Sequence, residues 1–148
     1  MTYGFSGKIL HVDLSEGNLE IEQPEPSFYR KYPGGSALGM YYLLQHTPAN
    51  VDPLGPENTI VFSVGPLTGA PISGQSRLTV TAKSPLTGAA GDSQSGGFFP
   101  AEMKFSGFDA VVVYGQAQEL VYLRLKDGTA ELRPANHLGG QVTGRVPA

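Results

Sequence analysis

The sequence of 148 residues contains no cysteine. Without cysteine, the chain can form no disulfide, can offer no thiolate nucleophile, and cannot on its own hold a cysteine-ligated zinc ion or an iron–sulfur cluster. Histidine is also scarce, and His11, His46 and His137 lie too far apart in sequence to show a metal-ligand spacing. We therefore interpret the histidines as surface or packing residues.

Long apolar runs and an excess of positive charge are missing as well. No apolar segment approaches the roughly 20 residues of a membrane-spanning helix, and the first residues lack the charged and apolar blocks of a signal peptide. The formal net charge is −3 and the basic residues are dispersed, which argues against a dedicated nucleic-acid-binding protein or a basic membrane-binding surface. We expect a cytoplasmic protein with neither nucleic acid nor a membrane as its partner.

Glycine, proline, serine and threonine are instead concentrated in residues 65–97, where the charged side chains are Arg77, Lys83 and Asp92. Glycine at this density lets a backbone approach a flat or anionic molecule closely, and it leaves amide N–H groups free to donate to that molecule. We interpret this glycine-rich stretch as a ligand-binding surface, and the rest of the chain as its support.

Short helices are predicted at three places. Ser27 is a candidate N-cap for the first of these helices, which Pro33 must end. A third helix is predicted over residues 98–105, after the glycine-rich residues 88–97, and Ser106 and Gly107 are predicted to end it. The second helix is predicted over residues 37–45, with its buried face formed by Leu38, Tyr41, Tyr42 and Gln45.

Strands are predicted where β-branched and aliphatic residues dominate or alternate with polar ones. In the strand over residues 77–83, the even-numbered apolar positions face one side, and the odd-numbered polar positions, which include Arg77, face the other. We find no tandem repeat and no internal domain boundary, so residues 1–148 are predicted to form one domain of the α+β class with mainly antiparallel strands. The predicted strands are residues 8–14, 18–22, 59–64, 77–83, 109–115, 120–126 and 129–133. Two hairpins are predicted among them, with turns at residues 15–17 and at Asp127-Gly128.

Side chains for independent catalysis are scarce. No serine lies in a Gly-x-Ser-x-Gly elbow with an identifiable histidine partner, and the acids near the glycine-rich stretch are Asp92 and Glu102. Asp92 is typical of a turn residue that binds its own loop amides. Arg77 offers a planar fork of donors, and the amides that lead into the helix at residue 98 favour a phosphate. The residues alone leave open whether this is a ligand site or only a set of connections between strands.

A family resemblance favours the ligand site. The sequence resembles the N-terminal domain of the tungsten-containing aldehyde ferredoxin oxidoreductase family, in order along the chain to about Leu138. The resemblance implies two β-sheets that form a saddle-like surface on which a tungsten or molybdenum bis-pterin cofactor lies. The segments that carry the resemblance are residues 3–14, 33–39, 51–58, 65–69, 76–88 and 91–97.

The resemblance also implies site residues. In that family an arginine at the position of Arg77 contacts the cofactor, and the segment at the positions of Gln94, Ser95 and Gly96 contacts the pterin and its phosphates. The backbone carbonyl at the position of Gln94 is a magnesium ligand. Gln94 stands where the family has asparagine, a change that a main-chain ligand tolerates better than a side-chain contact does. The resemblance implies no catalytic residue in this chain.

Family members are much longer, and their later domains supply the iron–sulfur cluster and the active site. The resemblance therefore implies a C-terminally truncated or split form of the domain, which binds the cofactor together with a large partner subunit that carries the cysteine-rich domains. The complete enzyme would oxidise an aldehyde to a carboxylic acid and pass the electrons to ferredoxin. The alternatives are a non-catalytic binding or assembly domain and the remnant of a split gene. A homo-oligomer is a further expected assembly.

Overall fold

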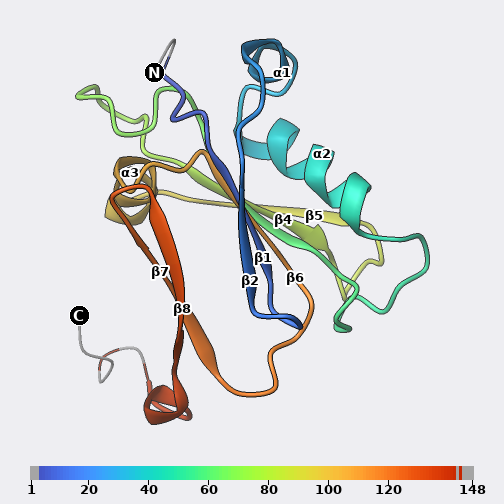
Figure 1. Ribbon diagram of the computed structural model, residues 1–148. Helices are drawn as coiled ribbons and strands as arrows, with labels where there is room; N and C mark the ends of the chain where they lie inside the picture. Colours follow the sequence, from blue (N-terminus) through green and yellow to red (C-terminus); the bar gives the residue numbers. More distant parts are fainter. Residues whose placement is uncertain (1–3, 143, 145–148) are drawn as a thin grey trace.

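The structure is a computed structural model that describes residues 4–142 and residue 144. These residues form a six-stranded sheet, a separate two-stranded sheet and a few short helices (Figure 1). The predicted α+β class is therefore confirmed. The elements are β1 (Ile9–Asp13), β2 (Asn18–Glu22), α1 (Pro26–Lys31), α2 (Gly35–His46), β3 (Ile60–Val64), β4 (Leu78–Lys83), β5 (Ala90–Ser95), α3 (Phe98–Phe105), β6 (Ala110–Tyr114), β7 (Val121–Lys126), β8 (Thr129–Pro134) and the short 3-10 helix η1 (Asn136–Leu138).

The six-stranded sheet has the strand order β2-β1-β6-β3-β4-β5. Its neighbouring strands are antiparallel except for β1 and β6, which are parallel, with Ile9 opposite Ala110. Strands β7 and β8 form the second, antiparallel sheet. Their turn is the predicted Asp127-Gly128 pair, in which both residues have the positive φ that this short hairpin turn requires.

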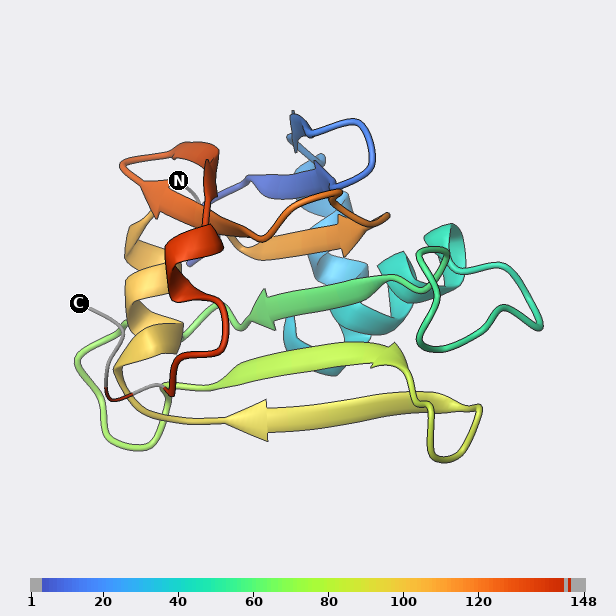
Figure 2. The ribbon, with the colours of Figure 1, turned by 90° about the horizontal axis from the view of Figure 1, so that it is seen from below.

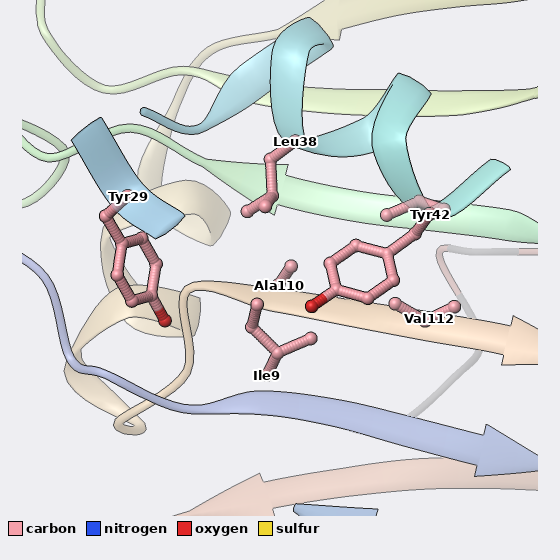
Figure 3. Close-up of a cluster of buried hydrophobic side chains, with 7 residues drawn as sticks. Ile9, Tyr29, Leu38, Tyr42, Ala110 and Val112 are labelled. Atoms are coloured by element: carbon pink, nitrogen blue, oxygen red, sulfur yellow. The ribbon is translucent and has the colours of Figure 1, made fainter. Parts of the chain in front are cut away.

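The six-stranded sheet has a hydrophobic core on each face. Figure 1 shows α2 and the β7–β8 hairpin on opposite sides of this sheet. On the α2 side, Leu38 and Tyr42 of the helix pack against Ile9, Val61 and Val112 of the strands (Figure 3). Because buried apolar area is the main favourable term in folding, these contacts fix α2 on the sheet. None of the helices in the described part of the chain has the length and apolar character of a membrane span.

On the opposite face, Leu10, Val12 and Val111 form a second core together with Met103 of α3 and Phe108. The apolar residues of the β7–β8 hairpin are only partly buried against this core. Figure 2 shows α3 across one end of the sheet, beside the hairpin. This face is therefore less completely covered than the face beneath α2.

Two details of the predicted elements are wrong, and one feature of β4 was not predicted. The N-cap of α1 is Glu25 rather than Ser27, because Pro26 takes the first helical position, where its missing N–H costs nothing. In α2 Gln45 is exposed, whereas Leu43 is buried. The threonines of β4 lie on the face that the sequence assigns to polar residues, yet Thr79 and Thr81 are 4% and 0% exposed because α2 covers them.

Candidate functional site

The glycine-rich stretch contains a strand that the sequence does not predict. Residues 88–97 read as a glycine-rich segment that leads into a helix, but β5 (Ala90–Ser95) forms within them and pairs antiparallel with β4. Asp92 lies opposite Thr81 in this ladder, so it is not the turn residue that we predict from the sequence. Glycine and aspartate are depleted in strands, and this strand forms because the edge of β4 offers backbone partners.

The predicted site residues lie together at one end of the β4–β5 ladder. Leu78 is opposite Ser95, so Arg77, one residue before Leu78, comes beside Gly96, one residue after Ser95. Arg77, Gln94, Ser95 and Gly96 are all exposed. The structure thus brings the four residues to one region of the surface, although they come from two separate segments.

The side chains of Gln94 and Ser95 point to opposite faces of the sheet, because successive residues of a strand alternate. Gln94 shares its face with Thr79, on the α2 side, and Ser95 shares its face with Leu78 on the other side. A ligand on one face can touch only one of these side chains. The backbone groups alternate too: the hydrogen bond from Ser84 N–H to the Ala89 carbonyl sets a register in which the backbone N–H and C=O of Ser95 point to β4, and those of Gln94 point to the free edge of β5.

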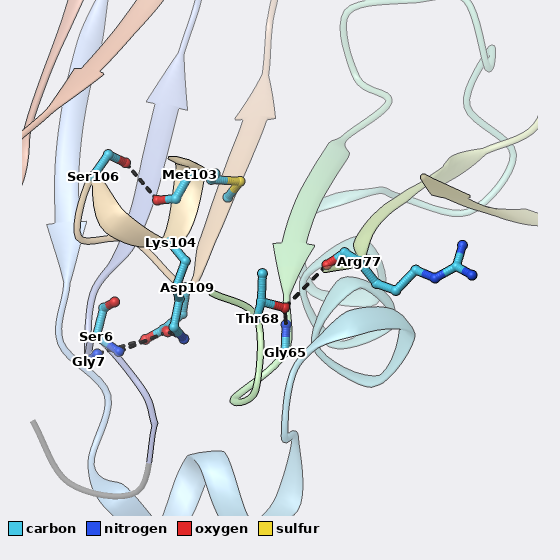
Figure 4. Close-up of polar contacts among 9 residues, drawn as sticks. All are labelled: Ser6, Gly7, Gly65, Thr68, Arg77, Met103, Lys104, Ser106 and Asp109. Atoms are coloured by element: carbon cyan, nitrogen blue, oxygen red, sulfur yellow. Dashed lines mark hydrogen bonds and ion pairs between the residues drawn. The ribbon is translucent and has the colours of Figure 1, made fainter. Parts of the chain in front are cut away.

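Thr68 holds the backbone of Arg77 in place (Figure 4). Its Oγ1 accepts a hydrogen bond from the N–H of Gly65 at 3.1 Å, and it donates to the carbonyl oxygen of Arg77 at 3.4 Å. The Arg77 side chain extends away from these contacts, and it takes part in none of the ion pairs among the described residues. Its guanidinium is therefore available to an anion.

The segment before β4 is tied to the segment after β5. The Ser76 hydroxyl donates to the carbonyl oxygen of Gly97 at 2.6 Å. A Cβ on Gly96 would lie 3.4 Å from the Ser76 carbonyl oxygen, whereas a Cβ on Gly97 would meet no described atom within 4 Å. Gly97 has a φ of 98°, a conformation that L side chains rarely adopt. Beside Arg77, the surface therefore consists of bare backbone.

Helix α3 begins directly after these glycines. Gly97 is its N-cap, and the cap makes no side-chain hydrogen bond to the helix amides. The N-terminus of a helix carries partial positive charge and unsatisfied N–H groups, which favour an anion. Arg77, the bare backbone at Gly96 and Gly97 and the start of α3 together form a surface suited to a phosphate. We call this surface the Arg77 site.

A separate cavity of about 520 Å³ lies between α3, the six-stranded sheet and the β7–β8 hairpin. Its walls are mostly apolar, and they include Phe62, Phe99, Met103, Val113 and Leu123. None of the four predicted site residues lines it. The sequence gives no signal for this cavity, because its residues come from segments that are far apart in the chain.

A buried ion pair, which sequence reasoning missed, anchors α3 near its C-terminal end. Lys104 Nζ pairs with the Asp109 carboxylate, and the side chains are 8% and 1% exposed (Figure 4). The same carboxylate accepts hydrogen bonds from the N–H groups of Ser6 at 2.9 Å and Gly7 at 2.7 Å. This network joins α3, the start of β6 and the N-terminal segment, and it gives the helix a fixed position beside the Arg77 site.

Two histidines that are distant in sequence meet at the other end of the fold. The rings of His11 and His46 are 5.4 Å apart, and His46 stacks on Tyr114. His11 Nε2 lies 2.8 Å from the Glu22 carboxylate, which also accepts a hydrogen bond from the Tyr42 hydroxyl at 2.7 Å. Desolvation lowers the pKa of His46, and the nearby His11 lowers it further.

Metal coordination finds no support in these side chains. Among residues 4–142 and residue 144, no group of three or more histidine, cysteine or acidic residues could hold a metal ion. A metal at the Arg77 site would need main-chain oxygen atoms, such as the Gln94 carbonyl at the edge of β5, or ligands from another molecule.

Comparisons with known proteins identify the family. Residues 9–147 match the family model described as aldehyde ferredoxin oxidoreductase, N-terminal domain. The chain belongs to this family. It is 42% identical to the tungsten-containing aldehyde ferredoxin oxidoreductase of Thermococcus kodakarensis and 40% identical to that of Pyrococcus furiosus, in each case over 146 residues. Both alignments cover 99% of this chain and 24% of the relative, so the chain spans about a quarter of the length of these curated relatives.

A solved structure shows the same fold in a different enzyme. The chain superimposes with a TM-score of 0.89 and 36% identity on part of the active-site complex BamBC of benzoyl coenzyme A reductase, a structure in complex with 1,5 Dienoyl-CoA. The match covers 95% of this chain and 21% of that chain. The aldehyde ferredoxin oxidoreductase N-terminal fold therefore supports more than one reaction, and the fold alone does not select a substrate.

Proposed function

We propose that this chain is the tungstopterin- or molybdopterin-binding part of an aldehyde:ferredoxin oxidoreductase-like enzyme, completed by a partner chain that carries the iron–sulfur cluster and the active site. The observation that carries the proposal is the exposed Arg77 guanidinium beside the bare backbone of Gly96 and Gly97. The tungsten in the names of the relatives supports the class of cofactor. The quarter-length coverage supports the need for a partner.

The residues at the Arg77 site fit a flat, anionic cofactor. Arg77 can bind a phosphate through two parallel N–H···O bonds, and at Gly96 and Gly97 no side chain blocks the approach to the backbone. The Gln94 carbonyl at the edge of β5 is a hard oxygen ligand of the kind that magnesium prefers. When bound, the bis-pterin cofactor supplies the metal-centred two-electron oxidation of an aldehyde to a carboxylic acid.

The role of this chain in such an enzyme is to bind and orient the cofactor. Thr68 and Ser76 fix the two backbone segments that meet at the Arg77 site. The described residues that form the Arg77 site include no acid or base, so proton transfer is assigned to the partner chain. The aldehyde, and the choice between tungsten and molybdenum, depend on that chain.

The test is purification of the chain from its native cells, followed by elemental analysis and identification of co-purifying proteins by mass spectrometry. We expect tungsten or molybdenum together with a cysteine-rich partner. Arg77→Ala should lose most of the metal, whereas Arg30→Ala, at an exposed arginine of α1, should retain it. A chain that is alone, metal-free and unresponsive to added pterin cofactor would contradict the proposal.

The second candidate function is a non-catalytic binding or assembly domain. The exposure of the apolar side chains Phe98, Phe99 and Phe105 on α3 favours it, because apolar side chains gathered on one surface often mark a protein contact. The same purification separates the two candidates. A stable partner without stoichiometric tungsten or molybdenum supports the second function, whereas metal that depends on Arg77 supports the first.

A further inference from the structure

The ladder between β4 and β5 stops at its last pair, Leu78 and Ser95. In an antiparallel ladder every second pair exchanges backbone hydrogen bonds, and Leu78 and Ser95 form such a pair, because the Ser95 backbone points to β4. Two residues further along, the next pair of this kind would be Ser76 and Gly97. No backbone hydrogen bond joins these two residues in the described part of the chain.

The Ser76 side chain takes the place of the missing backbone bond. Its hydroxyl donates to the Gly97 carbonyl oxygen at 2.6 Å, and this oxygen is the acceptor that the Ser76 N–H would use if the ladder continued. Serine side chains compete with backbone groups for hydrogen bonds in this way. The side-chain bond therefore ties Ser76 to Gly97 and leaves the N–H groups of both residues outside the ladder.

Gly97 has a conformation that suits an open ladder and not a continued one. Its φ of 98° and ψ of −156° lie in a region that is essentially restricted to glycine, whereas a strand residue has a negative φ. Packing does not explain the glycine, because a Cβ there would meet no described atom within 4 Å. At Gly34, which has a similar conformation before α2, a Cβ would come within 2.4 Å of the Val64 carbonyl oxygen. Gly34 is thus required for packing, and Gly97 for its conformation alone.

We propose that Ser76 is a positioning residue for the Arg77 site: its bond to Gly97 holds the end of the β4–β5 ladder open, so that the Gly97 N–H stays available to a phosphate. The inference rests on the proposed function, because it concerns how that site holds a cofactor phosphate. Arg77 follows Ser76 directly, and the register brings it beside Gly96. A phosphate here would receive donors from both segments, the guanidinium from one and the Gly97 N–H from the other.

Without the Ser76 hydroxyl, the ladder can close by one more pair. Gly97 then rotates to the negative φ of a strand, and its N–H donates to the Ser76 carbonyl oxygen instead of to a ligand. A phosphate must reopen the ladder before it binds, so its apparent affinity falls in proportion to the open fraction of the chain. The net contribution of one such hydrogen bond corresponds to a loss of about 2- to 12-fold.

The test is a titration of the full, cofactor-free chain with inorganic phosphate, followed by NMR at the amide signals of residues 96–98. The wild type should bind phosphate, and Ser76→Ala should bind it about 2- to 12-fold more weakly. Ser76→Thr keeps the hydroxyl and should bind like the wild type, as should the control Ser73→Ala, at an exposed serine of the segment before β4. No phosphate binding by the wild type, or equal binding by Ser76→Ala, would overturn the inference.

Hydrogen exchange at the Gly97 N–H, measured without phosphate, separates this role from a general loss of stability. If Ser76 holds the ladder open, exchange should be fast in the wild type and slower in Ser76→Ala, where the extra ladder bond protects the amide. A merely structural role predicts the opposite, because the loss of a hydrogen bond loosens the segment and speeds exchange. Faster or unchanged exchange in Ser76→Ala would therefore contradict the role of Ser76.

The two proposals fail in different ways. A wild-type chain that retains tungsten or molybdenum, together with a Ser76→Ala variant that binds phosphate as tightly as the wild type, contradicts only the role of Ser76. A metal-free wild-type chain that ignores added pterin cofactor contradicts the proposed function. In that case, slower exchange and weaker phosphate binding in Ser76→Ala would still support the open ladder.

Discussion

Gly39 of α2 lies directly against Thr81 of β4. A Cβ on Gly39 would come within 2.2 Å of the Thr81 hydroxyl oxygen and 2.8 Å of the Thr81 Cβ. The absence of a side chain at Gly39 therefore lets the helix approach the strand closely enough to bury Thr79 and Thr81. This close approach explains why β4, whose odd-numbered residues are polar, has both faces covered along part of its length.

Gly39→Ala should destabilise the fold by about 1–3 kcal/mol, because the added methyl group overpacks the contact with Thr81. The loss should appear although alanine is the better helix former by about 1 kcal/mol. The measurement is urea unfolding followed by circular dichroism. Ser36→Ala, on the same helix, is the control. An unchanged unfolding midpoint for Gly39→Ala would show that α2 can move away from β4 at little cost.

Thr68→Val should destabilise the chain by about 1–3 kcal/mol. Thr68 is buried, and the substitution removes the hydroxyl that accepts the hydrogen bond from the Gly65 N–H. Thr59 is the matched control, because it is fully buried and its hydroxyl has no hydrogen-bond partner among the described residues. Thr59→Val should therefore cost little or even stabilise the fold. Chemical unfolding of both variants checks the prediction, and equal losses for the two would contradict it.

Lys104→Met should cost about 3–5 kcal/mol, because it leaves the buried Asp109 carboxylate without its counter-charge. Lys126→Met, at an exposed lysine of β7, should have little effect. The variant should also loosen the N-terminal segment, since Ser6 and Gly7 bind the same carboxylate. Unfolding curves measure the first effect, and hydrogen exchange at these two amides measures the second. Unchanged stability in Lys104→Met would mean that water replaces the ammonium group at no cost.

The parts of the fold that could be predicted from sequence are those with a local signal. Alternation and turn chemistry were enough to predict the β1–β2 and β7–β8 hairpins. The glycine at residue 107 was enough to predict the end of α3. Strand β5 carries no such signal, because its residue types are typical of loops and it depends on the neighbouring edge of β4. The burial of Thr79 and Thr81 likewise depends on Gly39, which is distant in sequence.

The candidate site likewise has a part that could be predicted from the sequence and a part that could not. Arg77 and Gln94 were proposed from the family resemblance, and the register of β4 and β5 places them at one end of the sheet. Their role in cofactor binding stays a prediction. The Lys104–Asp109 pair and the 520 Å³ cavity could not be predicted, because each joins residues that only the tertiary fold brings together. Pattern reasoning on one chain has no access to such contacts.

His46 should make the stability of the fold depend on pH. Desolvation and the nearby His11 lower its pKa in the folded state, and only Glu22 opposes this shift. The faces of the His46 ring are occupied by Tyr42 and Tyr114, which are neutral at the pH values concerned. The folded chain therefore disfavours the protonated form of His46, and the unfolded chain takes up the proton at a higher pH.

The direction of the effect follows from this difference in proton binding. Above the unfolded pKa of about 6.5, His46 is neutral in both states and contributes no slope. As the pH falls through that value towards the lowered folded pKa, the unfolded state binds more protons, so the free energy of unfolding decreases. Denaturant unfolding between about pH 7.5 and pH 5 should show a smaller decrease for His46→Gln than for the wild type. His137→Gln, at an exposed histidine of η1, should keep the wild-type decrease, and an equal decrease in all three proteins would exclude His46 as its source.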